Sequence, residues 1–177
     1  MSNPTGNNQT GSNPTGCHPI RTGSGSNATV GTEVGTTAGS QTLVVERVFP
    51  HPPEKLWRAL TESTLLAQWM MTNDFAPEVG RRFQFRTEPR PTWNGVVDCE
   101  VLVIDPLQRL SYSWGVGGSE SGLQWVVLWT LTRAEGGTHL RMEQSGFRPE
   151  QQANYQGASY GWQKFFGNLE RVIGGME

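Results

Sequence analysis

The strongest constraint on the fold is a long stripe of apolar side chains near the C-terminus. From about residue 149 to residue 173, apolar residues recur at three- and four-residue steps, the period of an α-helix with one buried face. The stripe contains Tyr155, Ala158, Trp162, Phe165, Phe166, Leu169, Val172 and Ile173. A continuous helix of this length has about seven turns. Its wide aromatic face therefore needs a large concave partner.

Six segments that precede the stripe have the character of β-strands, most of them alternating apolar and polar residues. They are residues 42–49, 81–86, 96–104, 110–114, 123–131 and 138–144. The connections among the last five are short, and short connections join antiparallel neighbours. Two short helices, 54–60 and 64–70, are expected after the first strand. The sequence thus predicts an α+β domain in which a curved antiparallel sheet of about six strands surrounds the C-terminal helix.

The N-terminal segment has a different composition from the rest. In residues 1–40, Gly, Ser, Thr, Asn, Gln and Pro fill 30 positions, only Arg21 and Glu33 are charged, and no residue is aromatic. Such a segment cannot bury enough apolar surface to offset its conformational entropy. We therefore expect a disordered, low-complexity tail over residues 1–41 and one domain over residues 42–177.

Charge and hydropathy exclude several classes of protein. A formal net charge of −2 with only two lysines gives no positive surface for nucleic acid. No apolar run approaches the roughly 18 residues of a membrane span, and the N-terminus lacks the pattern of a secretory signal. Cys17 and Cys99 form no disulfide framework or metal motif, which favours a reduced, cytoplasmic setting.

Three features suggest catalysis or metal binding, but the residues around each of them point away from that chemistry. Residues 157–161 match the hydrolase pattern G-x-S-x-G, yet Ser159 lies inside a helical stripe and no His follows it. The three histidines do not cluster, so no metal and no cofactor are expected. Asp98 and Glu100 share the polar face of one strand, where a solvated surface is a more common role than acid–base catalysis.

Several short motifs, in order along the chain, resemble the START-like (SRPBCC-type) domains. They are ERVF (46–49), PEKLWRAL (53–60), LAQW (66–69), WNG (93–95), DP (105–106), RLSYSW (109–114), SGF (145–147) and GW (161–162). The chain is most similar, over residues 43–173, to the branch named for homology to the activator of the heat-shock-protein-ninety ATPase. The resemblance implies a helix-grip fold, with an apolar cavity between sheet and helix. Lipid carriers, polyketide cyclases and co-chaperone domains share this fold, so it assigns no single function.

The side chains expected between sheet and helix are the candidates for a ligand site. They are Phe85, Trp93, Cys99, Tyr112, Trp114, Trp129, Met142, Gln144, Tyr155, Trp162 and Phe165. The alternative for some of them is a filled aromatic core. Gln144 stands where a His is common in the family, and an inward-facing amide needs hydrogen-bond partners. We expect a water or a ligand to supply them.

Three glycines interrupt the predicted C-terminal helix. Gly157, Gly161 and Gly167 each cost about 0.8–1.0 kcal/mol relative to Ala in a helix interior. Close approach of the helix to the sheet is one reason for such residues, and a loop in place of the first part of the stripe is another. A third is a bend near residues 157–161 that opens the cavity.

Three functions remain open at this point. The favoured one is a binding protein for a small apolar or aromatic ligand, because the inward-facing set lacks convergent acid–base groups. The second is a cyclase- or aromatase-like enzyme, with Tyr112 and Gln144 as candidates for proton transfer. The third is a co-chaperone that activates a chaperone ATPase, which the lack of the activators' larger partner domain disfavours. A homodimer also stays open, with Trp57 and Trp69 as core, pocket-rim or dimer residues.

Overall fold

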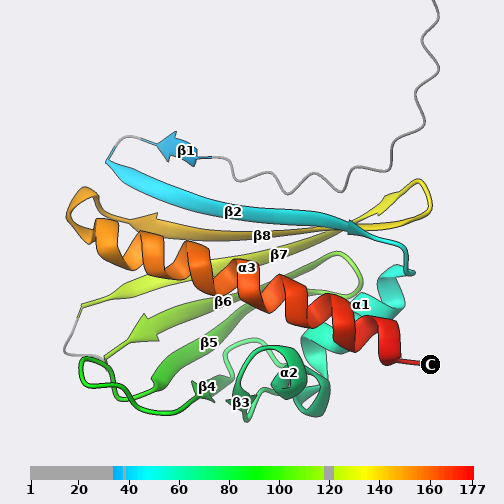
Figure 1. Cartoon of the computed structure of the whole chain (residues 1–177), viewed down its shortest axis with the longest axis horizontal. Coiled ribbons are helices and arrows are strands. Elements are labelled where there is room, and N and C mark those ends of the chain that lie inside the picture. Colours follow the sequence, from blue (N-terminus) through cyan, green and yellow to red (C-terminus); the bar gives the residue numbers. More distant parts are fainter. Residues whose placement is uncertain (1–33, 38, 118–121) are drawn as a thin grey trace, which may run out of the picture.

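The computed structural model describes residues 34–37, 39–117 and 122–177. The elements are β1 (Val34–Thr37), β2 (Ser40–Phe49), α1 (Pro53–Thr61), α2 (Ser63–Trp69), β3 (Thr72–Asn73), β4 (Arg82–Arg86), β5 (Val96–Asp105), β6 (Arg109–Val116), β7 (Gln124–Ala134), β8 (Gly137–Phe147), the 3-10 turn η2 (Pro149–Gln151) and α3 (Gln152–Gly175). In this part of the chain the strands form one 8-stranded antiparallel sheet in the order β1-β2-β8-β7-β6-β5-β4-β3. The long helix α3 crosses one face of that sheet (Figure 1).

The predicted α+β helix-grip architecture is confirmed. Strands β4 to β8 follow one another as antiparallel neighbours, and β2 closes the arrangement by pairing with β8. The pairing sets Leu43 opposite Gln144 and Val45 opposite Met142. The helices α1 and α2 lie by the C-terminal end of α3 (Figure 1). Trp69 of α2 is buried and donates its indole N–H to the Ala59 carbonyl at 2.9 Å, so it belongs to the core.

Two short strands extend the sheet beyond the predicted six. The first, β1, pairs with β2, and the expected boundary between residues 41 and 42 falls within this hairpin. The disorder expected for residues 1–33 lies outside the described residues, as do Cys17 and His18. The second is β3, which pairs Thr72 with Arg86 at the other edge of the sheet.

Helix α3 is a single helix from Gln152 to Gly175, which excludes a loop over the first part of the stripe. Its buried residues are Tyr155, Trp162, Phe166, Leu169 and Ile173, at the spacing of one helical face. A Cβ atom built on Gly157, Gly161 or Gly167 would meet no atom within 4 Å. Close approach to the sheet is therefore excluded as the reason for these glycines.

Aromatic rings fill the middle of the space between α3 and the sheet. Trp129 of β7 is fully buried, and its ring centroid lies 5.6 Å from that of Trp162 and 5.8 Å from that of Phe166. It also meets Trp69 edge-on at 5.9 Å. Stacked and edge-to-face contacts of this kind add to the free energy gained by burial. The centre of the predicted cavity is consequently occupied by side chains.

Candidate functional site

A pocket of about 220 Å³ remains beside the first turns of α3, at the end away from α1 and α2. The loop before β5 supplies Trp93, and the strands supply Val97, Trp114, Val116, Trp125, Gln144 and Phe147. Helix α3 supplies Asn154, Gly157, Ala158, Trp162 and Phe165. Most of these residues are aromatic or aliphatic. None of the described lining residues carries a charge.

Strand alternation and helical periodicity bring these residues together. On β6 to β8 the inward positions bear Trp114, Trp125 and Gln144, all of them buried. On α3 the positions that face the pocket recur at three- and four-residue steps from Asn154 to Phe165. The pocket is therefore a product of the same two periods that build the core.

One short hydrogen bond joins the two walls of the pocket. The indole N–H of Trp162 donates to Oε1 of Gln144 at 2.6 Å, and the Gln144 side chain is almost fully buried. The sequence predicts a water or a ligand as the hydrogen-bond partner of this amide. In the structure the amide oxygen accepts its hydrogen bond from a protein side chain, Trp162. The bond holds the Trp162 ring in place against β8.

Five of the eleven predicted site residues line the pocket, namely Trp93, Trp114, Gln144, Trp162 and Phe165. The other six are buried outside its wall, namely Phe85, Cys99, Tyr112, Trp129, Met142 and Tyr155. The prediction missed the other seven lining residues, namely Val97, Val116, Trp125, Phe147, Asn154, Gly157 and Ala158. Trp125 shares its strand face with Trp129, and Asn154 and Ala158 precede Trp162 by eight and four positions, so the two periods place these three on the inward side.

The environment of Tyr112 does not suit proton transfer. Its hydroxyl accepts a hydrogen bond from the Trp129 indole at 2.9 Å, deep in the core. Burial raises the pKa of Tyr112 well above its ordinary value, and the hydrogen bond from Trp129 lowers it by less. The phenol therefore stays protonated near neutral pH, and it does not line the pocket.

The family model of the activator of Hsp90 ATPase homolog 1-like proteins matches residues 50–174. The chain belongs to this family. The assignment agrees with the START-like branch indicated by the sequence motifs. No curated protein matches the chain.

This member of the Hsp90-activator-homologue family is also similar to several solved structures. Protein MLL2253 from Mesorhizobium loti is 50% identical, with a TM-score of 0.70 over 77% of this chain and 98% of its own. DynU16, a protein from the dynemicin biosynthetic locus, is 26% identical, with a TM-score of 0.63 over 76% of this chain and 47% of its own. CalU16 from Micromonospora echinospora is 17% identical, with a TM-score of 0.66 over 83% of this chain and 86% of its own. This similarity shows the shared fold alone.

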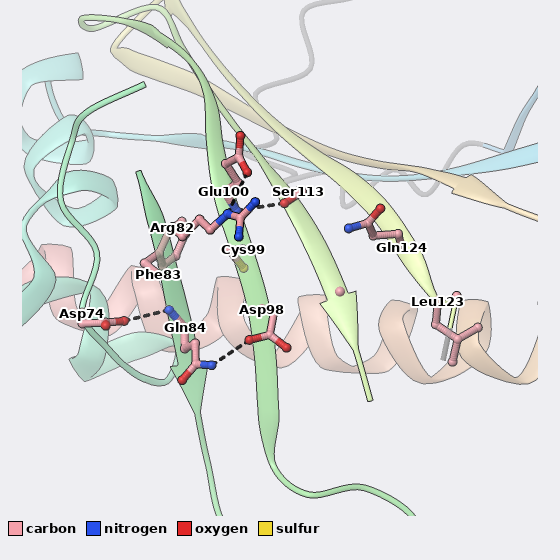
Figure 2. Close-up of a pocket in the computed structure, with 12 residues that line it drawn as sticks. Asp74, Arg82, Phe83, Gln84, Asp98, Cys99, Glu100, Ser113, Leu123 and Gln124 are labelled. Carbon is pink, nitrogen blue, oxygen red and sulfur yellow. Dashed lines mark hydrogen bonds and ion pairs between the residues drawn. The ribbon is translucent and has the colours of Figure 1, made fainter. Parts of the chain in front are cut away.

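A second hollow, of about 800 Å³, lies over β4 to β7 on the sheet face away from α3 (Figure 2). Most of its lining residues are polar or charged, and the Asp74 carboxylate accepts a hydrogen bond from the Gln84 backbone N–H at 2.7 Å. Gln84 donates to Oδ1 of Asp98 at 2.7 Å, and Arg82 lies 3.3 Å from the Glu100 carboxylate. In this family member the outer sheet face is thus a surface of solvated ion pairs and hydrogen bonds.

The described residues hold neither a cluster of metal-ligating groups nor an activated thiol. Among them, no three His, Cys, Asp or Glu side chains gather in a group able to hold a metal ion. Burial raises the pKa of the Cys99 thiol, and the Asp98 and Asp74 carboxylates add to the shift, so the thiolate needed for nucleophilic attack is disfavoured. Within the same residues, no helix combines the length and apolarity needed to cross a membrane.

Proposed function

We propose that this protein binds one small, neutral ring compound in the pocket between the sheet and the first turns of α3. The observation that carries the proposal is the pocket itself, about 220 Å³ in volume with aromatic walls and no charged side chain among its described lining. An apolar cavity of about 150 Å³ is large enough for benzene. A compound of one or two rings matches the volume available here.

The walls of the pocket are held in place before any ligand arrives. Each of three lining indoles donates its N–H to a fixed acceptor: Trp93 to the Val96 carbonyl at 3.0 Å, Trp125 to Gln151 at 3.2 Å and Trp162 to Gln144 at 2.6 Å. A preorganised site loses less conformational entropy when a ligand binds. Fixed aromatic walls favour a flat ring as the ligand.

The packing of the core argues for a small ligand over a long-chain lipid. Beyond Trp162, the space under α3 contains the rings of Trp129 and Phe166, which stack with their centroids 5.8 Å apart. An extended acyl chain would have to displace these rings. The small pocket at one end of the helix requires no such change.

Binding is favoured over a cyclase-like reaction by the chemistry of the lining residues. The polar side chains in the wall, outside the indoles, are the amides of Gln144 and Asn154. Carboxamides do not ionise near neutral pH and serve poorly as general acids or bases, so they position a ligand better than they transform it. Activation of a chaperone ATPase stays an alternative, and a saturable rise in chaperone ATPase rate on adding this protein would support it.

Protein purified from its own host is expected to carry the ligand. Because the pocket wall is apolar and uncharged, organic extraction followed by mass spectrometry should release a neutral compound of one or two rings. Protein denatured and refolded in ligand-free buffer is the control. Recovery of long-chain lipids in place of such a compound would contradict the proposed size of the site.

Filling the pocket should abolish binding. Ala158 lines it and is half-buried, so the indole added by Ala158→Trp occupies the space of the ligand. We expect Ala158→Trp to raise the Kd for 1-indanone at least tenfold, measured by isothermal titration calorimetry. Ala153→Trp is the matched control, because Ala153 is exposed on the same helix. Equal affinity in both variants would place the ligand elsewhere.

A further inference from the structure

We infer that the ligand carries a carbonyl-type hydrogen-bond acceptor, and that the amide nitrogen of Gln144 recognises it. The inference rests on the proposed function, because it names the polar group of a ligand in the same pocket. It makes Gln144 the residue that determines which ring compounds are bound.

The hydrogen bond between Trp162 and Gln144 fixes the orientation of the Gln144 amide. An indole N–H is a donor only, so the amide atom that it meets at 2.6 Å is the oxygen. The nitrogen, with two N–H donors, points to the other side of the planar group. Gln144 lies in the middle of β8, paired with Leu43 on one side and Val127 on the other, so two neighbouring strands fix its backbone position.

The pocket wall thereby presents a donor with no charge nearby. The indole N–H groups of Trp93 and Trp125 are bonded to protein acceptors. Besides the Gln144 nitrogen, the lining contains the indole of buried Trp114 and the amide of exposed Asn154. The variants below keep both of these donors, so they isolate the contribution of Gln144. A ligand oxygen that accepts from this nitrogen adds a hydrogen bond on a wall that is otherwise mostly apolar. A carboxylate would need a cation, and the described lining contains none. A ketone, lactone, quinone or neutral amide fits these conditions.

The test compares 1-indanone with indane, two compounds of nearly equal shape that differ by one carbonyl. A wall without a donor prefers indane, because the carbonyl gives up its hydrogen bonds to water on burial. We expect wild-type protein to bind 1-indanone at least as tightly as indane. Calorimetric titration of both compounds gives the ratio of their Kd values.

A double variant removes the donor without creating a substitute. Gln144→Met alone frees the Trp162 N–H, which lies 2.6 Å from the amide oxygen and could then bond the carbonyl. Gln144→Met is therefore combined with Trp162→Phe, and Trp162→Phe alone is the matched control. The Kd ratio should shift at least tenfold towards indane in the double variant relative to the control.

The outcomes separate this inference from the proposed function. If wild-type protein binds both compounds but prefers indane as strongly as the double variant does, the role of Gln144 is wrong and the pocket still binds rings. If neither compound binds at millimolar concentration, both proposals fail. Should the double variant not fold, the NMR signals of the Gln144 side-chain amide in wild-type protein decide. They should shift with 1-indanone more than with indane, and equal shifts would overturn the inference.

Discussion

Trp129→Ala is expected to lower the free energy of unfolding by about 3–5 kcal/mol, the range for removing a fully buried tryptophan. Trp129 has 0% exposure and joins three parts of the fold, since its ring contacts Trp69 of α2 and both Trp162 and Phe166 of α3. The substitution therefore leaves a cavity where the sheet, the short helices and the long helix meet. It also removes the indole N–H that donates to the Tyr112 hydroxyl.

Urea denaturation monitored by circular dichroism measures this loss. Tyr160→Ala is the control, because Tyr160 is 77% exposed on the outer side of α3. Surface substitutions of this kind usually change stability by less than about 0.5 kcal/mol. A Trp129→Ala loss of similar size would show that the rings under α3 do not hold the helix against the sheet.

The local periods of the chain predicted the arrangement of the described elements well. The alternation in β7 buries Trp125, Val127, Trp129 and Leu131 on one face, as expected. Period alone did not predict where the alternation breaks. In β5 a register shift follows Val101, and Val103, which strict alternation would place on the same face as Val101, is exposed. A bulge depends on the pairing with β6, which a single strand does not encode.

Non-local pairing accounts for the remaining differences in the sheet. Strand β3 has only two residues, too few to show any period, and it exists because Thr72 and Asn73 meet the end of β4. The pairing of β2 with β8 joins residues about a hundred positions apart. The spacing of apolar residues along the chain does not indicate this pairing.

The candidate site was harder to predict than the fold. Alternation shows that Tyr112 and Trp114 both face α3, and the two rings are neighbours 6.4 Å apart. Only Trp114 lines the pocket, because Tyr112 is enclosed by Phe83 and Phe85 at 5.6 and 6.0 Å. Whether an inward side chain borders a void depends on how rings from several strands fit together. That property belongs to the packed structure and has no period along the chain.

Replacing Gly157, Gly161 and Gly167 together with Ala is expected to raise the free energy of unfolding by roughly 2.5–3 kcal/mol. The gain comes from helix propensity, because the added methyl groups meet no atom within 4 Å. Gly137→Ala is the contrasting control. A Cβ there would lie 1.9 Å from the Phe49 carbonyl oxygen, so that variant should be strongly destabilised. Urea denaturation of both variants measures the difference.

The third explanation for these glycines, a bend that opens the cavity, stays a prediction. Gly157 lines the pocket and Gly161 lies one turn further along α3, so weak helix propensity is concentrated where a ligand would enter. Gly161→Ala adds its methyl group outside the pocket lining, and Gly167→Ala makes the same change further from the pocket. If entry requires local opening of the first turns, Gly161→Ala should slow ligand association in stopped-flow fluorescence and Gly167→Ala should not. Equal rates in both variants would reject the bend and leave the pocket accessible with α3 intact.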